Sequence, residues 1–143
     1  MKVRDVMTRE AECTRPTATL QQAAEQMKRL NVGVLPVCEN DRLVGMITDR
    51  DITVRSVSTG NNPLLDEVGS IMTPDVISCF EDQDVTEAAQ IMQEKQIRRL
   101  VVLTRDKRLV GIVSLGDLAV ETKDEDLVGE ALERISEPAA PTR

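Results

Sequence analysis

Hydrophobic residues between positions 20 and 30 recur every third or fourth residue, the spacing of an amphipathic helix with one buried face. Thr19 precedes this stretch, and Gln22 lies three residues after Thr19. This spacing is the pattern of a capping box at a helix N-terminus. Gly33 follows the last apolar position and favours a helix end. The pattern therefore predicts a helix that begins after Thr19 and is broken near Gly33.

Two short apolar runs follow this helix, at 34–38 and 43–48, with a polar turn between them. Runs of this length on either side of a short turn predict a β-hairpin. Pro36 has no N–H to donate, so the first strand should lie at a sheet edge or carry a bulge. A short strand at 11–13 and a second helix from Asp49 complete a strand–helix–strand–strand–helix unit.

The whole pattern recurs in the second half of the chain. An offset of 65 residues pairs Met7-Thr8 with Met72-Thr73, and after one extra residue the offset becomes 66. One copy is small for an independent core, so two copies that bury each other's exposed sheets give a physical reason for the duplication. The chain then consists of a first repeat at 3–59, a linker at 60–67, a second repeat at 68–122, and a C-terminal helix with a flexible tail at 123–143.

Composition removes several classes of function. The sequence has no His, Trp or Tyr and a single Phe. Without His, the Ser-His-Asp and Cys-His catalytic arrangements and His-containing zinc sites are excluded, and we expect no enzyme. Without aromatic side chains, stacking on nucleobases is unavailable, and the net charge of −7 argues against a nucleic-acid partner. No apolar run is long enough for a membrane span, so we expect no membrane partner.

The three cysteines form an odd number, and the opening residues lack the apolar core of a signal peptide. We therefore expect a reducing cytoplasm. A strand–helix–strand crossover makes the first two strands parallel, and they could be neighbours, which would bring Cys13 and Cys38 together. The sequence leaves two readings of this pair open: a disulfide, or two buried thiols that act as small apolar groups.

One short stretch occurs in both copies and carries the chemistry. Gly45–Asp51 and Gly111–Asp117 each read Gly, two apolar residues, a hydroxyl residue, two spacers and Asp. A hydroxyl at the end of a strand can cap the following helix, and the open N–H groups of the first helical turn attract an anion. An Asp three residues later can accept two hydrogen bonds from a vicinal diol such as a ribose.

These features together resemble a pair of cystathionine β-synthase-type (CBS) domains, called a Bateman module. The resemblance rests on the two Met-Thr openings, the strand at 34–37, the Leu-Val-Gly runs and both Gly-to-Asp stretches. It implies an α/β (α+β) fold of tandem βαββα repeats packed sheet to sheet with pseudo-twofold symmetry. It also implies a stand-alone regulatory module and a disc-like homodimer that signals to an unknown regulated protein. The implied ligand is an adenine nucleotide or adenosine derivative, with AMP first and ADP, ATP, NAD or S-adenosylmethionine as the others.

Carried over onto this sequence, the resemblance gives two clefts of different quality. In site B, Asp51 would accept from the ribose, Thr48 would meet phosphate, and arginines would supply positive charge. Site B consists of Thr48, Arg50, Asp51, Val76, Ile77, Ile97, Arg98 and Arg99. In site A, Gly33, Val34 and Gly116 stand at the positions of the three arginines of site B. Glu12 adds negative charge, so this cleft is weaker. Site A consists of Ala11, Glu12, Val32, Gly33, Ser114 and Asp117.

Each assignment has an alternative that needs no ligand. Thr48 and Ser114 could only cap helices, and the two Asp residues could be ordinary first-turn acids favoured by the helix dipole. Arg98-Arg99 could be solvated or salt-bridged at the start of a strand. The alternative function is a structural dimerisation or interaction module with degenerate clefts and no ligand.

Overall fold

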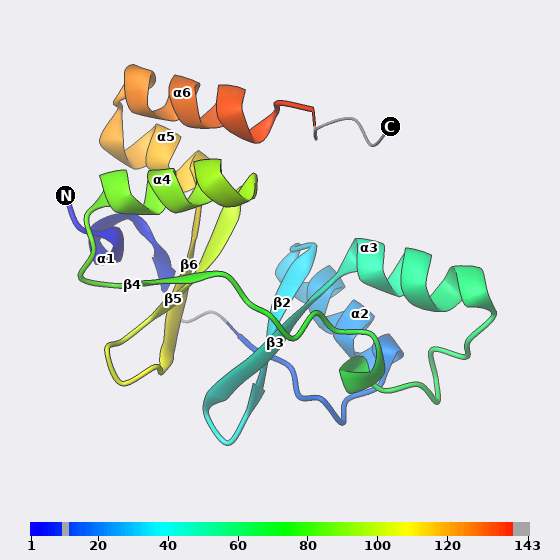
Figure 1. Cartoon of the computed structure of the whole chain (residues 1–143). Helices are drawn as coiled ribbons and strands as arrows, with labels where there is room; N and C mark the ends of the chain where they lie inside the picture. The colour runs from blue at the N-terminus through cyan, green and yellow to red at the C-terminus, as the bar shows by residue number, and fades with distance from the viewer. Residues whose placement is uncertain (10–11, 139–143) are drawn as a thin grey trace. The chain divides into compact units, whose positions relative to one another are not determined.

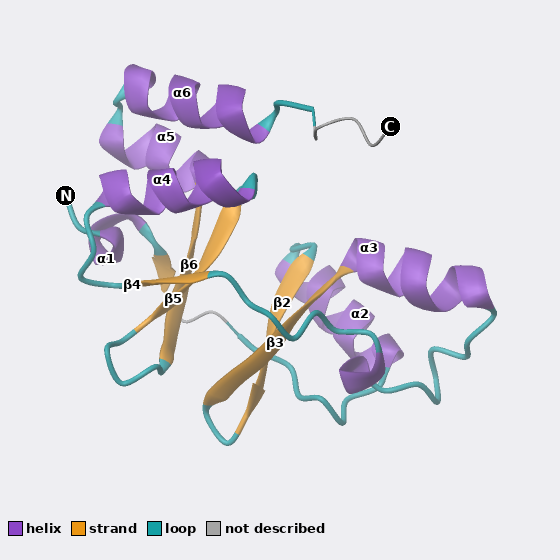
Figure 2. Cartoon of the chain, viewed as in Figure 1, coloured by secondary structure: helices purple, strands orange, loops and turns teal. Residues whose placement is uncertain are grey.

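The computed structural model describes residues 1–9 and 12–138, and Figures 1 and 2 show its helices and strands. The chain divides into two compact units: unit 1 combines Met1–Glu10 with Ile77–Arg143, and unit 2 is the continuous stretch Ala11–Val76. Each unit mixes helices and strands, as predicted. Ala11 and the tail from 139 onward lie outside the described residues. Within the described residues, no helix combines the length and the apolar character that a membrane crossing requires.

Unit 2 begins with α2 (Leu20–Leu30), which has the predicted capping box. The Thr19 hydroxyl accepts a hydrogen bond from the Gln22 N–H at 3.2 Å, and the Gln22 side chain accepts one from the Thr19 N–H at 2.9 Å. The helix ends at Asn31, which is left-handed with a φ of 55°. The prediction that Gly33 ends the helix is wrong, because Asn tolerates this conformation and completes the last turn two residues earlier.

The predicted hairpin and second helix follow in unit 2. A bulge lies between Val37 and Cys38, just after Pro36, in line with the expectation for this proline. The first strand of the hairpin pairs antiparallel with the second. The helical segment that follows begins as an α-helix, continues as a π-helix and ends in a 3₁₀ turn. These elements are β2 (Val34–Glu39), β3 (Arg42–Thr48), α3 (Asp49–Asp51), the π-helix η1 (Ile52–Ser56), and the 3₁₀ turns η2 (Val57–Thr59) and η3 (Val68–Ser70).

The strand predicted at 11–13 is reduced to a single parallel bridge between Thr14 and Val37. The Thr14 N–H donates to the Pro36 carbonyl at 2.9 Å, and the Cys38 N–H donates to the Thr14 carbonyl at 2.9 Å. In a strand, the N–H and C=O of one residue point to the same side. The next bond of this ladder would run from the N–H of residue 36 to the Glu12 carbonyl, and Pro36 has no N–H to donate. The prediction of a strand at Glu12 and Cys13 is wrong for that reason.

Unit 1 contains a four-stranded sheet in the order β1-β6-β5-β4. The β4–β5 pair is parallel, and the other pairs are antiparallel. At the position equivalent to Pro36 this unit has Val101, and its first strand is complete. The elements are α1 (Val3–Val6), β1 (Thr8–Arg9), β4 (Ser78–Phe80), α4 (Val85–Lys95), β5 (Arg99–Leu103), β6 (Leu109–Ser114), α5 (Leu115–Thr122) and α6 (Glu125–Ile135).

The two Met-Thr segments are exchanged between the repeats. Thr8, from the opening of the first repeat, pairs with Ile112 of the second repeat inside unit 1. Thr73, from the opening of the second repeat, pairs with Met46 of the first repeat inside unit 2, through N–H···O bonds of 2.8 and 2.9 Å. Each sheet is thus completed by a segment that the sequence assigns to the other repeat.

The glycine that opens each Gly-to-Asp stretch lies under one of these exchanged segments. A Cβ on Gly111 would stand 2.6 Å from the Thr8 carbonyl oxygen, and a Cβ on Gly45 would stand 2.9 Å from the Thr73 carbonyl oxygen. The Met7 Sδ atom would stand 2.9 Å from the Cβ on Gly111, and the Met72 Sδ atom would stand 2.8 Å from the Cβ on Gly45. The doubled glycine is therefore required by backbone approach in both units.

Each unit has its own hydrophobic core. In unit 2 the fully buried side chains include Leu20, Leu35, Val37 and Ile47. In unit 1 they include Met92, Leu100, Val102 and Leu118. The C-terminal helix α6 lies along α4 and α5 (Figure 1) and contributes to the core of unit 1.

Candidate functional site

The first Gly-to-Asp stretch ends in a reciprocal pair of hydrogen bonds. Thr48 leaves β3 in an extended conformation, and its hydroxyl accepts from the Asp51 N–H at 3.0 Å. The Asp51 Oδ2 atom accepts from the Thr48 N–H at 3.0 Å. Both side chains are half-buried, and the neighbouring Arg50 is exposed. The helix-capping role is thus real for both residues, and among the residues that the structure describes it leaves the Oδ1 atom of Asp51 without a backbone partner.

The second stretch repeats this geometry in unit 1. The Ser114 hydroxyl accepts from the Asp117 N–H at 3.0 Å, and Asp117 Oδ2 accepts from the Ser114 N–H at 2.9 Å. Here too both side chains are half-buried. A carboxylate has about four lone-pair positions, so each Asp retains acceptor capacity after it has capped its helix. Capping and ligand binding are therefore compatible roles for the two aspartates.

Glu12, the acid that the sequence adds to site A, is paired. Its two carboxylate oxygens accept from Arg29 at 3.1 and 2.8 Å in a bidentate ion pair. The hydrogen bonds from Arg29 hold the pKa of Glu12 below its ordinary value. The negative charge that Glu12 adds to site A is thus paired, because α2 brings a basic residue from its last turn to meet it.

Arg98 and Arg99 lie at a pocket of about 420 Å³ in unit 1, together with Ser114 and Gly116. The Leu115 N–H at the start of α5 donates to the Arg98 carbonyl at 2.8 Å, which fixes the start of β5 beside the helix. Both arginine side chains are exposed, and the ion pairs found in the described residues do not include them. The alternative in which these two arginines are salt-bridged is therefore not supported among the described residues.

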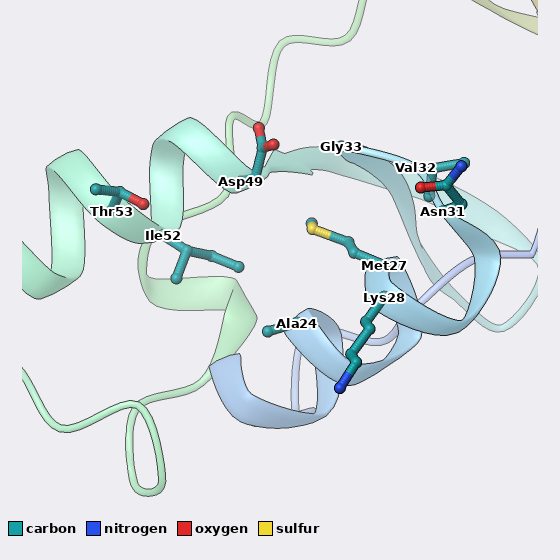
Figure 3. A pocket seen from close by; sticks show the side chains of 9 residues that line it. All are labelled: Ala24, Met27, Lys28, Asn31, Val32, Gly33, Asp49, Ile52 and Thr53. Carbon is teal, nitrogen blue, oxygen red and sulfur yellow. The ribbon is translucent and has the colours of Figure 1, made fainter.

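Two residues expected in site A, Val32 and Gly33, border a pocket of about 530 Å³ between α2 and the helical segment after β3 (Figure 3). Asp49 lies on the same pocket, and its N–H donates to the Gly33 carbonyl at 2.9 Å. A Cβ on Gly33 would stand 2.9 Å from the Asp49 Oδ2 atom. A larger residue at Gly33 would therefore require the exposed Asp49 side chain to shift.

The remaining residues of the two predicted sites are divided between the units. Val76 is half-buried at the end of unit 2. Ile77 and Ile97 are half-buried and pack against the core of unit 1. Ala11 lies outside the described residues. Because both predicted sites combine residues of unit 1 with residues of unit 2, each site as a whole stays a prediction.

All three cysteines are free. Cys13 is exposed and Cys38 is buried; both border one pocket of unit 2, but they do not form the disulfide. Burial raises the pKa of the Cys38 thiol to about 12, and its neighbours Cys13 and Asp41 add to the rise. Burial alone raises the pKa of Cys79 to about 11. Among the residues that the structure describes, no group of three or more Cys, Asp or Glu side chains could hold a metal ion.

Several residues at these pockets were not foreseen from the sequence. Lys28 and Asn31 border the pocket of unit 2, and Val128 and Leu132 of α6 border the pocket of unit 1. The sequence does contain one relevant signal: Asn31 and Gln96 are aligned by the repeat offset and have the same left-handed backbone, with φ of 55° and 53°. Helix periodicity predicts the C-terminal helix itself, but it does not predict that this helix borders the pocket of unit 1.

Comparisons with known proteins match both repeats. The family described as "CBS domain" matches residues 3–57 and 68–124. Among curated proteins, the chain is 40% identical to the CBS domain-containing protein YhcV of Bacillus subtilis over 134 residues, which is 94% of each chain. The two proteins are therefore similar along almost their whole lengths.

Three solved structures are similar to this chain. Hypoxic Response Protein I, solved with two coordinated zinc ions, has a TM-score of 0.77 at 34% identity, covering 85% of this chain and 98% of that one. The CBS domain pair of protein MJ0100, solved with 5-methylthioadenosine and S-adenosyl-L-methionine, has a TM-score of 0.76 at 25% identity. CBSX2 in complex with AMP has a TM-score of 0.73 at 25% identity. These last two each cover 87% of this chain and 98% of their own.

Proposed function

The chain belongs to the CBS domain family, and from this premise we propose that it is a regulatory module that binds an adenosine-containing small molecule, AMP foremost. Two relatives of similar fold are described with such ligands, one with AMP and one with S-adenosyl-L-methionine and 5-methylthioadenosine. CBS domain pairs are typically regulatory, and the proposal assigns no reaction to the chain.

The observation that carries this proposal is the doubled Asp at a capped helix start. Asp51 and Asp117 are each held by a backbone N–H through Oδ2, so their carboxylates are fixed in orientation before any ligand arrives. The Oδ1 atom remains to accept from a ribose hydroxyl. A pre-oriented acceptor lowers the cost of ordering a side chain on binding.

Of the two predicted sites, we favour site B for a phosphorylated ligand. Thr48, Arg50 and Asp51 would supply the helix-start half, and Arg98 and Arg99 would supply positive charge without a competing carboxylate. The other members of site B are Val76, Ile77 and Ile97. Site A would use Ser114 and Asp117 with Ala11, Glu12, Val32 and Gly33. It has no comparable pair of arginines, so a less charged ligand such as a nucleoside derivative suits it better.

We also propose that the module acts in the cytoplasm as a homodimer and regulates a partner protein. One observation favours self-association as a second candidate function in its own right. Val54 and Val120 occupy equivalent positions in the two repeats, and their side chains are 46% and 69% exposed. Apolar side chains exposed at matching positions suit a symmetric contact between copies. Native mass spectrometry of freshly purified protein would report the mass of the assembly and any retained nucleotide together.

Calorimetric titration with AMP, ADP, ATP, NAD and S-adenosylmethionine tests the ligand proposal. The sharpest variant is Asp51→Asn, because an Asn side chain can still cap the helix through its carbonyl oxygen while the charge is lost. We expect it to weaken AMP binding by at least about tenfold, the scale of a hydrogen bond to a charged group. Asp117→Asn is the matched control for site A. Absence of heat with all five ligands, or unchanged binding in both variants, would contradict the proposal.

A further inference from the structure

Two of the three thiols border a single pocket of unit 2. This pocket, of about 500 Å³, is lined by both Cys13 and Cys38. The segment that leads into α2 forms one wall, and the turn of the β2–β3 hairpin, Glu39–Asp41, forms the other. The pocket shares no residue with the predicted sites A and B or with the pocket of Figure 3. The thiol pair thus lies outside the residues proposed to bind a nucleotide.

Hydrogen bonds fix the backbone that carries these two thiols. The Cys13 carbonyl accepts from the Gln26 side chain of α2 at 3.2 Å. Thr14, the next residue, donates its N–H to the Pro36 carbonyl at 2.9 Å. The Thr14 carbonyl accepts from the Cys38 N–H, also at 2.9 Å. Cys38 is thus bonded directly to the residue that follows Cys13.

The two thiols also share one face of this short ladder. Thr14 and Val37 are bridge partners, and both side chains are buried. Side chains alternate along a strand, so Cys13 and Cys38, one residue before and one residue after this bridge, point to the other face. Cys38 accordingly lies outside the core cluster that contains Val37. Burial raises the pKa of Cys38 to about 12, and the nearby Cys13 adds to the rise, in agreement with this placement.

Unit 1 has different residues at the equivalent positions. The repeat offset aligns Cys13 with Ser78 and Cys38 with Leu103. In unit 1 a regular parallel ladder between β4 and β5 holds the first strand, whereas in unit 2 Pro36 reduces this strand to one bridge. The thiol pair therefore occurs in the unit whose first strand has the weaker backbone pairing. A covalent link at this place would supply what the ladder lacks.

The two thiols are unequal in a way that suits stepwise oxidation. Cys13 is exposed, whereas only 7% of Cys38 is exposed. Oxidants react with an accessible thiolate, so Cys13 is attacked first while Cys38 is shielded. An exposed cysteine beside a second, resolving cysteine is the usual arrangement of a redox-sensing pair. Both cysteines are free in the structure, which therefore describes the reduced state of the pair.

We propose that Cys13 and Cys38 form a reversible redox switch, which hydrogen peroxide closes to a disulfide and a dithiol reductant opens. The Cys13 thiolate attacks one peroxide oxygen and the O–O bond breaks, which leaves a sulfenic acid and a hydroxide that takes up a proton to become water. The Cys38 sulfur then attacks the Cys13 sulfur, and the S–OH bond breaks as the S–S bond forms. The Cys38 proton leaves with this hydroxide as a second water. Two thiols thus lose two electrons to one peroxide.

The closed switch fixes the start of unit 2. It ties Cys13 covalently to β2, next to the single bridge at Thr14, and thereby restricts the segment that also carries Glu12. The link closes a long loop and so restricts the unfolded chain, which makes unit 2 harder to unfold. The module then has a second input, an oxidant, besides the proposed ligand. This input is tested without any nucleotide.

Thiol counting tests whether the link forms. The reduced full-length protein is freed of reductant, treated with hydrogen peroxide, denatured and alkylated with iodoacetamide. We expect the number of alkylated cysteines to fall from three to one, and dithiothreitol to restore all three. Peptide mapping without reductant should link the peptide of Cys13 to that of Cys38. Three alkylated cysteines after peroxide, a link that includes Cys79, or a link between two chains on a non-reducing gel would each overturn the proposal.

Three variants assign the roles of the cysteines. Cys13→Ser changes an exposed residue and should abolish the link. Cys38→Ala should leave Cys13 without a resolving thiol, so that peroxide oxidises it to the sulfinic acid instead. Cys79→Ala is the matched control, because it also removes a buried thiol and should still form the link. Loss of the link in Cys79→Ala, or its persistence in Cys13→Ser, contradicts the proposal. Circular dichroism confirms that each variant is folded before these results are compared.

Hydrogen–deuterium exchange tests whether the link acts on the first strand. In the oxidised protein the Thr14 amide should exchange at least about fivefold more slowly than in the reduced protein. Peroxide-treated Cys13→Ser should show no such change. The melting temperature should rise by about 5 °C or more on oxidation. Equal exchange rates and equal melting temperatures in the two states would mean that the disulfide does not fix the strand, and the proposed switch would be wrong.

Discussion

Gly111 lies so close to the backbone of Thr8 that a Cβ at this position would stand 2.6 Å from the Thr8 carbonyl oxygen. The two residues are neighbours through the β1–β6 pairing, although they come from opposite ends of the chain. The glycine thus opens the stretch that ends at Asp117 and also accepts the segment that closes the sheet. Gly111 belongs to a stretch that looks like a ligand-binding motif, but it is backbone packing that requires a glycine there.

Gly111→Ala should therefore destabilise the protein. The contact is with backbone, which cannot move away as a side chain would, so we expect a loss of about 1–3 kcal/mol in the free energy of unfolding. Urea denaturation measures it. Gly129→Ala is the matched control, since a Cβ there meets nothing within 4 Å and the residue lies inside α6. That control should stabilise the protein by about 0.5–1 kcal/mol, and equal effects of both changes would refute the packing argument.

Pro36→Val should lengthen the first strand of unit 2. The substitution restores the N–H that would face the Glu12 carbonyl, as the Thr14 ladder on the same side of β2 indicates. Hydrogen–deuterium exchange followed by NMR would then show a protected amide at position 36 and slower exchange at Thr14. Rapid exchange of the new amide would mean that something other than the missing donor ends this strand.

The Glu12–Arg29 pair predicts a pH dependence of defined sign. The pKa of Glu12 is held below 4.5 in the folded protein, so the pair stabilises the fold above that pH and its contribution is lost as pH falls through the folded pKa. NMR titration should show the Glu12 pKa returning toward 4.5 in Arg29→Gln. Salt should do the same, because both side chains are exposed to solvent. A Glu12 pKa that is unchanged in Arg29→Gln would contradict the ion pair.

The thiols should differ strongly in reactivity. Cys13 is exposed, whereas burial raises the pKa of Cys38 to about 12 and of Cys79 to about 11. Iodoacetamide at pH 8 should modify Cys13 first, since the thiolate is the reactive form. Mass spectrometry of the alkylated protein under native and then denaturing conditions counts one and then three sites. Fewer than three sites without a reductant would indicate the disulfide that the structure does not contain.

The raised thiol pKa values carry a stability consequence in the opposite pH range. A group whose pKa is raised on folding stabilises the fold below its unfolded value, here 9.0, and loses this contribution as pH rises toward the folded value. We therefore expect thermal stability to fall above pH 9. Cys79→Ala should show a smaller fall than the parent protein when melting temperatures are compared between pH 8 and pH 10.5.

What the sequence predicted well was local or repeated. The capping box at Thr19 and the hydroxyl caps at Thr48 and Ser114 follow from spacing within one turn, and the offsets reveal both copies. What it could not predict depends on residues that meet only in the folded chain. The pairing of Glu12 with Arg29 is one case, and the covering of α4 and α5 by α6 is another. The joint sites that combine both units stay predictions.

The exchanged Met-Thr segments also bear on how the chain is made. Unit 2 is continuous, so every residue of it has left the ribosome while the second half is still being synthesised. Unit 1 cannot close its sheet until Ile112 emerges to pair with Thr8, a contact of very high sequence separation. β1, the first strand to be synthesised, therefore stays unpaired until β6 has emerged. We expect unit 2 to fold cotranslationally, with an N-terminal arm left unpaired, and unit 1 to fold only after β6 has emerged from the ribosome.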